Sequence, residues 1–205
     1  MLDPELIRDN LARVREAVGP GVEILAATKY VEAADLPALA AGGVALVGEN
    51  RSDALLEKQA LHGPLFTWDF IGQLQSRKVK DIAPHVRLIH SVASESALRK
   101  LEEHPAKEVL IQVNVAGEEG KAGIAPEELG DFIAACPVPV TGLMTMPPFV
   151  ERPEDNRRHF ARLAELAAEH GLSRLSMGTS QDYEVAAEEG ATIVRLGSVL
   201  LRPGS

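Results

Sequence analysis

The sequence has a single cysteine, Cys136, so no internal disulfide bond can form. Because Cys136 lies beside Pro137 in an apolar stretch, we interpret it as a small buried residue rather than a reactive thiol. No stretch approaches about 18 uninterrupted apolar residues, and the charged start MLDPELIRDN has no apolar signal core. We therefore expect neither a membrane span nor a secretory leader, and we expect the protein to be cytoplasmic.

The sequence also has no run of lysines or arginines. Its 21 basic and 30 acidic side chains give a formal net charge of −9. Such a surface repels polyanions, so nucleic acid is not an expected partner. A phosphate ligand would have to be held by backbone amides, hydroxyls and one or two placed cations.

Two nucleotide-binding signatures are missing as well: the glycine-rich dinucleotide turn after the first strand and the GxxxxGK[ST] loop. Their absence argues against an open doubly wound sheet, which remains the competing fold. The 205 residues are 45% hydrophobic and 25% charged, as in an ordinary globular protein, and nothing in them is typical of a linker. We expect a single domain over residues 1–205 and a monomer.

Short apolar, often β-branched runs predict eight strands, with a helical pattern or a helix-length segment after each of the first seven. Helical periodicity is clearest at Ile7, Leu11, Val14 and Val18 and again at Phe160, Leu163, Ala164 and Ala167. Alternating strands and helices pair in parallel through right-handed crossovers, so the pattern favours an α/β fold, a (β/α)8 TIM-type barrel. The predicted strands are Ile24 to Ala27, Val44 to Val47, Phe66 to Ile71, Val86 to Ile89, Val109 to Val115, Val138 to Met144, Leu172 to Met177 and Ile193 to Leu196.

Lys29 is the only cation at the end of the first predicted strand, in EILAATKYVEA. A lysine leaving a barrel strand is well placed to attack an aldehyde, because apolar surroundings favour the neutral, nucleophilic amine. Lys29 is therefore a candidate for a Schiff base. The alternative is a solvated lysine at a strand end.

Two turns near the C-terminus, in RLSMGTSQDYE and TIVRLGSVLL, contain Gly178 and Gly197. Glycine lets a backbone approach a ligand closely, and successive N–H groups and hydroxyls can surround a phosphate without a lysine. In a barrel these turns follow the last two strands, where phosphate commonly binds, and Lys29 ends the neighbouring first strand. Alternatively, Thr179 with Asp182 is a helix capping box, and Gly197 merely ends a strand.

Seven motifs, in order along nearly the whole chain, resemble the pyridoxal phosphate homeostasis proteins, which are single-domain barrels similar to the N-terminal domain of alanine racemase. Two positions depart from that family: Asp69 stands where histidine is usual, and Gln73 where proline is usual. The motifs are AATKY, GEN (48–50), FIGQLQSRK (70–78), VNVAGEEGKAG (113–123), GLMTM (142–146), SMGTSQDYEVA (176–186) and GATIVRLGSVLL (190–201).

This resemblance implies a site for pyridoxal 5'-phosphate (PLP). It implies that Lys29 forms the Schiff base and that Arg195 faces the pyridine nitrogen, although Arg195 alone would also suit a salt bridge at the barrel rim. A permanent guanidinium beside that nitrogen disfavours protonation of the ring, so transaminase-like chemistry is not expected. The remaining implied cofactor-binding residues are Asn50 and Met144 at the ring and Ser180, Gly197 and Ser198 at the phosphate.

The leading hypothesis is a PLP-binding protein that buffers the free aldehyde or delivers it to apoenzymes, more a carrier than an enzyme. Racemisation would require a second acid or base, which alanine racemase takes from a tyrosine of another domain. The chain ends at Ser205, and Tyr30 is expected to point away by strand alternation, whereas Tyr183 is expected on the helix after the phosphate turn. A racemase of low activity and a Schiff-base aldolase or phosphosugar isomerase remain alternatives. The six histidines show no HExxH or paired spacing, so we expect no metal.

Overall fold

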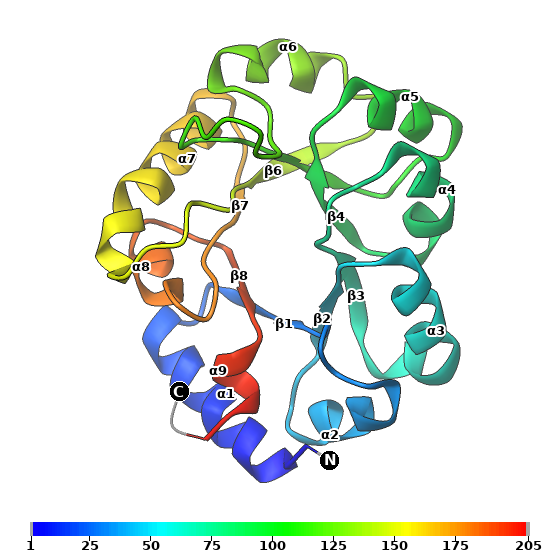
Figure 1. The fold of residues 1–205 in the computed structure, drawn as a ribbon, viewed down its shortest axis with the longest axis vertical. Coiled ribbons are helices and arrows are strands. Elements are labelled where there is room, and N and C mark those ends of the chain that lie inside the picture. Colours follow the sequence, from blue (N-terminus) through cyan, green and yellow to red (C-terminus); the bar gives the residue numbers. More distant parts are fainter. Residues whose placement is uncertain (1, 204–205) are drawn as a thin grey trace.

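A computed structural model describes residues 2–203 of the protein. Eight parallel strands close into a barrel in chain order, and β8 returns to pair with β1 (Figure 1). The expected (β/α)8 barrel is therefore confirmed. The strands are β1 Glu23–Ala27, β2 Leu46–Glu49, β3 Thr67–Phe70, β4 Leu88–Val92, β5 Val109–Gln112, β6 Val140–Met144, β7 Arg174–Ser176 and β8 Ile193–Leu196.

Helices surround the strands on the outside (Figure 1). The α-helices are α1 Pro4–Val18, α2 Leu36–Ala41, α3 Ser52–His62, α4 Val79–Ile82, α5 Glu95–Glu103, α6 Leu129–Ala134, α7 Arg157–Glu169, α8 Tyr183–Glu188 and α9 Ser198–Leu201. Short 3-10 helices are η1 Ala33–Asp35, η2 Gly63–Leu65, η3 Ser76–Lys78, η4 Ala83–His85, η5 Pro126–Glu128 and η6 Pro153–Asn156. Among the described residues, no helix combines the length and apolar character needed to cross a membrane.

The first helix, α1, lies beside α8 and α9 in the outer ring (Figure 1). Because α9 is a single turn, α1 covers the side of the barrel that a longer last helix would otherwise cover. Pro4 occupies its first turn, and the Asp3 carboxylate accepts a hydrogen bond from the Glu5 N–H at 2.9 Å. Both features stabilise the N-terminal end of α1. The predicted apolar stripe is buried, as expected for an outer helix: Ile7, Leu11, Val14 and Val18.

All eight predicted strands are present, but β2, β4, β6 and β7 begin two residues later than predicted. The first two of these show why. Val44 lies in the turn that ends α2, where its N–H bonds to the Leu39 carbonyl, and Val86 follows the 3-10 helix η4. Both are buried because they pack at helix ends. An apolar residue that closes a helix is thus indistinguishable, in the sequence, from one that opens a strand.

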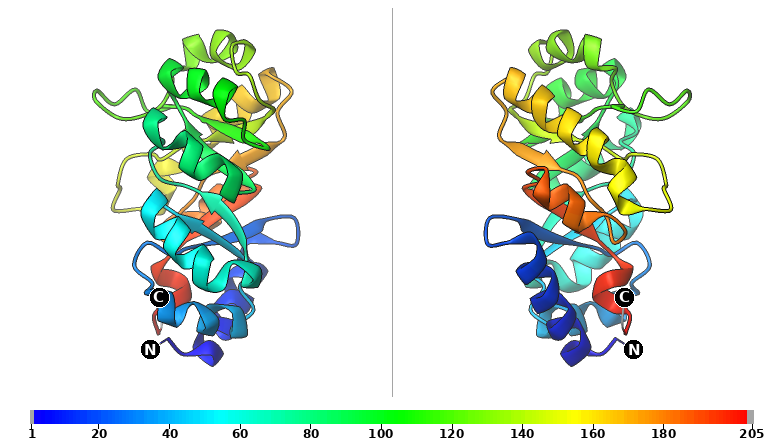
Figure 2. Two further views of the ribbon diagram at one scale, coloured as in Figure 1. Left: turned by 90° about the vertical axis from the view of Figure 1, so that its right-hand side faces the viewer. Right: turned by 90° about the vertical axis from the view of Figure 1, so that its left-hand side faces the viewer.

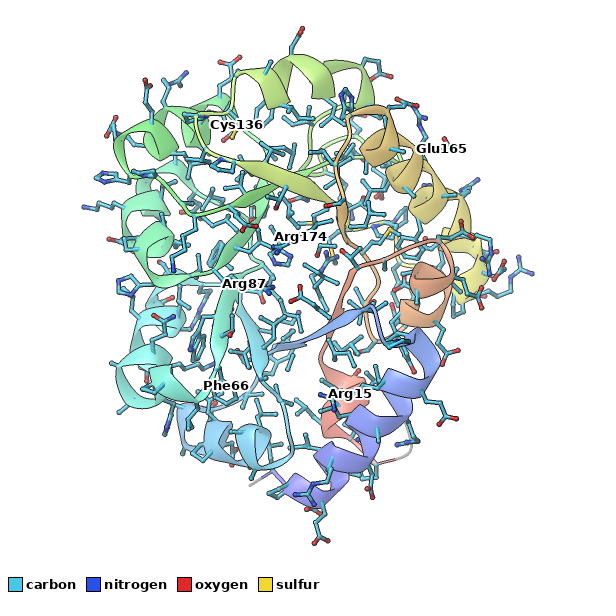
Figure 3. The ribbon with its side chains drawn as sticks, turned by 180° about the vertical axis from the view of Figure 1, so that it is seen from behind. Arg15, Phe66, Arg87, Cys136, Glu165 and Arg174 are labelled. Atoms are coloured by element: carbon cyan, nitrogen blue, oxygen red, sulfur yellow. The ribbon has the colours of Figure 1, made fainter. Side chains whose placement is uncertain are left out.

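The barrel has two apolar layers. A large cluster fills the space between strands and helices, and a smaller one fills part of the barrel interior. The rest of the interior is polar, and Figure 3 shows Arg87 and Arg174 near the centre of the ring of strands. The small inner cluster consists of Leu25, Leu46, Leu88, Leu110, Met144 and Ile193.

The loops after β5 and β6 project from one side of the barrel, and the loop between α1 and β1 projects from the opposite side (Figure 2). In a parallel barrel, all carboxyl ends of the strands open on one face. The segments after β1, β7 and β8 therefore meet on the face that carries the projecting β5 and β6 loops. The predicted site residues are therefore expected on that face.

Candidate functional site

One cavity of about 650 Å³ opens at the carboxyl ends of the strands, and all seven predicted site residues line it. Loops after β1, β2, β7 and β8 contribute to it, as do the ends of β6 and β8. Residues that are more than 160 positions apart in the chain are thus brought together by barrel closure. The seven are Lys29, Asn50, Met144, Ser180, Arg195, Gly197 and Ser198.

The cavity carries positive charge within an acidic protein. Lys29, Arg195 and Arg202 line it, whereas none of its described lining residues is an aspartate or glutamate. The whole chain has a net charge of −9, so the sign of the charge in the cavity is opposite to that of the protein as a whole. A concave site with this charge favours a small anionic ligand.

Lys29 lies in the turn that follows β1, two residues beyond the last strand residue, and is exposed at the mouth of the cavity. The expected apolar enclosure of its amine is not present in this structure. The expectation that Tyr30 points away is also wrong, since Tyr30 lines the cavity and its ring centroid lies 4.7 Å from the Lys29 Nζ. Strand alternation does not apply here because both residues lie in a turn.

A buried ion pair anchors this turn, and the sequence analysis missed it. Lys58 on α3 pairs with Glu49 at the end of β2, and its Nζ also donates to the Thr28 carbonyl at 2.8 Å. The Thr28 hydroxyl donates to the same carboxylate at 2.7 Å, and the Asn50 N–H donates to its other oxygen at 3.1 Å. One carboxylate therefore fixes the backbone on both sides of the cavity mouth.

The two glycine turns are joined by Ser180. Its Oγ accepts hydrogen bonds from the N–H groups of Gly197 at 3.0 Å and Val199 at 3.4 Å. The capping interpretation also holds in part, because the Asp182 carboxylate accepts from the Thr179 N–H at 2.7 Å just before α8. The turns therefore form one unit with hydroxyls and amides beside the cavity.

The two glycines in these turns play different parts. Gly178 has φ +91°, and a Cβ there would lie 2.6 Å from the Ala186 Cβ, so this glycine serves the turn and its packing against α8. Gly197 lines the cavity, and a Cβ there would meet no protein atom within 4 Å. The space beside Gly197 is thus open to a ligand.

Arg195 is buried and makes no ion pair among the described residues, so the alternative of a salt bridge at the rim is wrong. Its two Nη atoms donate to the Ser176 carbonyl and Oγ at 2.7 and 2.6 Å, and to the Thr145 carbonyl and Met146 Sδ at 2.8 and 2.9 Å. Burial lowers its pKa to about 10, partly offset by the distant Asp182. A buried guanidinium without a carboxylate favours an anionic or acceptor ligand nearby.

Comparison with known proteins agrees with this geometry. The family model of the alanine racemase N-terminal domain matches residues 2–202. The pyridoxal phosphate homeostasis protein of Aquifex aeolicus is 41% identical, with 95% of this chain and 93% of that protein covered. The chain belongs to the pyridoxal phosphate homeostasis protein family. The Pseudomonas aeruginosa member is 39% identical, covering 92% of this chain and 90% of its own length.

Two solved structures are similar to this chain in fold. PipY of Synechococcus elongatus, solved with PLP bound, is 31% identical with a TM-score of 0.83, covering 96% of this chain and all of that chain. Alanine racemase of Corynebacterium glutamicum is 20% identical with a TM-score of 0.74, and 63% of that chain is covered. The racemase shares the barrel fold.

The two departures from the usual family pattern have different surroundings. Gln73 is exposed and lines the cavity. Asp69 is fully buried inside the barrel, where its carboxylate contacts Arg87 at 2.7 Å and the His90 Nε2 at 3.1 Å. Among the described residues, no group of three or more potential ligands could hold a metal ion. Through these contacts with Arg87 and with each other, Asp69 and His90 form part of a polar network inside the barrel.

Acid should destabilise the protein partly through His90. Burial lowers the pKa of His90 below its ordinary value of 6.5, and the charges of Arg195 and Arg87 add to this against the opposing effect of Asp69. As the pH falls below about 6.5, the unfolded chain gains a proton that folded His90 does not, so the free energy of unfolding decreases. His90→Gln should remove up to about 1.4 kcal/mol per pH unit from this slope between pH 6.5 and 5.5.

Urea unfolding at several pH values measures this slope. His85→Gln, at an exposed histidine, is the matched control and should leave the slope unchanged. An equal slope in the His90→Gln variant and the wild type would show that His90 does not resist protonation in the folded state.

Proposed function

We propose that this protein binds PLP as a Schiff base on Lys29 and serves PLP homeostasis, by buffering the free aldehyde or by delivering it to apoenzymes. The observation that carries the proposal is the cavity itself. It holds an accessible amine, a buried guanidinium and two linked glycine turns, and none of its described lining residues is acidic. A phosphorylated aldehyde is the class of ligand that this combination suits.

The residues present fit PLP in size and polarity. The Ser180 hydroxyl and the open space at Gly197 suit the phosphate group, with Ser198 beside them at the start of α9. Buried Met144 offers an apolar wall to the ring, and Asn50 a polar side chain. When bound, PLP supplies an aldehyde carbon that bonds reversibly to an amine.

The chemistry of Arg195 favours a carrier. A guanidinium facing the pyridine nitrogen disfavours protonation of the ring, so the cofactor would be a weak electron sink. A cofactor held in this way can be stored without consuming amino acids by transamination. Arg195 therefore favours PLP binding over catalysis of amino-acid reactions.

Tyr30 is the side chain that a racemase hypothesis would have to use, because it lines the cavity and carries a titratable hydroxyl. Its ring packs against the Lys29 amine, so the two groups approach a ligand from the same side. A racemase needs acid and base groups on opposite faces of its substrate carbon. This arrangement favours the carrier over the racemase.

Titration of the purified protein with PLP, followed by visible absorption and equilibrium dialysis, tests the proposal. Absorption should saturate at one PLP per chain, and pyridoxal without phosphate should bind at least about tenfold more weakly. Equal affinity for the two aldehydes would contradict the assigned phosphate site. Failure to bind PLP at all would refute the proposed function.

Gly197→Ala should lower PLP affinity about tenfold while leaving thermal stability nearly unchanged. The added Cβ meets no protein atom, so its effect should fall on the ligand rather than on the fold. Isothermal titration and thermal unfolding measure the two quantities. Gly21→Ala, whose Cβ also meets nothing within 4 Å but which lies in the loop before β1, is the matched control. Equal PLP affinity in the two variants would place the phosphate elsewhere.

A further inference from the structure

A file of polar side chains crosses the barrel interior from one end to the other. It begins at the amino ends of the strands, where Arg87 pairs with Glu23 and with Asp69. It continues through His90 on β4 to Ser176 at the carboxyl end of β7. Ser176 contacts Arg195, which lines the cavity. The cavity is thus connected to the opposite face through hydrogen bonds.

The Asp69 carboxylate decides the hydrogen positions in this file, because it can only accept. The His90 Nε2, 3.1 Å from Asp69, must therefore carry a ring hydrogen and donate it. In neutral His90 the Nδ1 then has no hydrogen, and it accepts one from the Ser176 Oγ at 2.8 Å. Arg195 can only donate, and the same Ser176 Oγ accepts from it at 2.6 Å. Neutral His90 in this tautomer satisfies every bond of the file.

The Asp69 carboxylate is held in the acceptor state that this assignment requires. Burial pushes its pKa up, but the hydrogen bonds from His90 and Arg87 outweigh burial and leave the pKa lowered. Both Asp69 oxygens accept from Arg87, at 3.0 and 2.7 Å. Asp69 thus has a fixed orientation as well as a fixed charge.

Arg195 is held at four of its five donors. The four Nη hydrogens donate to Ser176, Thr145 and Met146. The remaining donor, Nε–H, has no acceptor among residues 2–203 and belongs to a side chain that lines the cavity. Rotation of the guanidinium would break several bonds at once, so the Nε–H is left to a ligand.

We propose that Asp69, His90 and Ser176 are positioning residues that hold Arg195 with its Nε–H toward the pyridine nitrogen of PLP. This inference rests on the proposed function and deepens it, because it identifies what orients the group that faces the ring. Neutral His90 also keeps a second positive charge away from Arg195. We call the hydrogen-bonded series Asp69, His90 and Ser176 the relay. By orienting Arg195, the relay controls how strongly the ring nitrogen is held unprotonated.

Two variants break the relay at different points. Ser176→Ala removes the hydroxyl that joins His90 to Arg195, with little change in volume. Asp69→Asn places an amide where Arg87 and His90 both require an acceptor, which forces His90 toward the other tautomer. Each should weaken PLP binding about tenfold and shift the pH midpoint of the bound visible absorption. Thr141→Val, which removes a hydroxyl bonded to Glu108 at the start of β6, is the control and should change neither.

Nitrogen-15 NMR of the histidine rings in ligand-free protein tests the relay without PLP. His90 should be neutral with its hydrogen on Nε2 at pH 7, and this signal should change in Asp69→Asn. A protonated ring, or a hydrogen on Nδ1, would overturn the relay. So would unchanged PLP affinity and an unchanged pH midpoint in both folded variants.

Failure of the proposed function would be recognised separately. Wild-type protein that forms no borohydride-stable adduct at Lys29 would refute the Schiff base and, with it, the role of the relay toward PLP. An adduct at Lys29, combined with unchanged PLP affinity and an unchanged pH midpoint in both Ser176→Ala and Asp69→Asn, would refute the relay alone. The NMR result distinguishes a broken relay from an unfolded variant, since a folded protein keeps its dispersed spectrum.

Discussion

Lys58→Met is expected to destabilise the protein by about 3–5 kcal/mol, because it leaves the Glu49 carboxylate buried without its cation. Both side chains are almost fully buried, and Lys58 also holds the Thr28 carbonyl in the turn that carries Lys29. PLP binding should weaken with it, since this turn loses an anchor. Urea unfolding and PLP titration measure the two effects.

Two further variants separate the causes. Glu49→Gln in the Lys58→Met background removes the unpaired charge and should recover part of the lost stability. Lys80→Met, at an exposed lysine of α4, should change the free energy of unfolding by less than about 0.5 kcal/mol. If Lys58→Met were as mild as Lys80→Met, the buried pair would not hold the turn in the manner described.

The sequence predicted the barrel because its eight apolar runs alternate with helical patterns. It placed β4 too early for two reasons: Val86 is apolar although it lies outside the strand, and His90 and Ser91 are polar although they lie inside it. Inward-facing polar residues of a barrel interrupt the apolar run that marks a strand. Strand existence was therefore predictable, whereas strand ends were not.

The predicted site residues lie on one cavity, but the groups that support them were missed. Lys58 gave a weak signal, because it falls three residues after Leu55 on the apolar face of α3. Asp69 was noticed only as a departure from the family pattern. Its partner His90 lies 21 residues further along the chain, and Ser176, which bonds to His90, lies 107 residues further. Hydrogen bonds between distant strands depend on barrel closure and register, which residue spacing does not reveal.

Lys29→Ala and Lys29→Arg should both abolish the visible absorption of the PLP complex and lower PLP affinity by at least about 100-fold. Arginine keeps the positive charge at the cavity mouth but cannot form the Schiff base, so it separates charge from covalent bonding. Lys121→Ala, at an exposed lysine in the loop after β5, is the control and should bind like the wild type. A Lys29→Arg variant that retained the absorption would show that another amine carries the aldehyde.

The most direct test is reduction of the PLP complex with borohydride, followed by digestion and mass mapping of the peptides. A single reduced adduct on the peptide that contains Lys29 is the predicted result, at one PLP per chain. An adduct on a different lysine, or none at saturating PLP, would contradict the assignment of this cavity as a Schiff-base site.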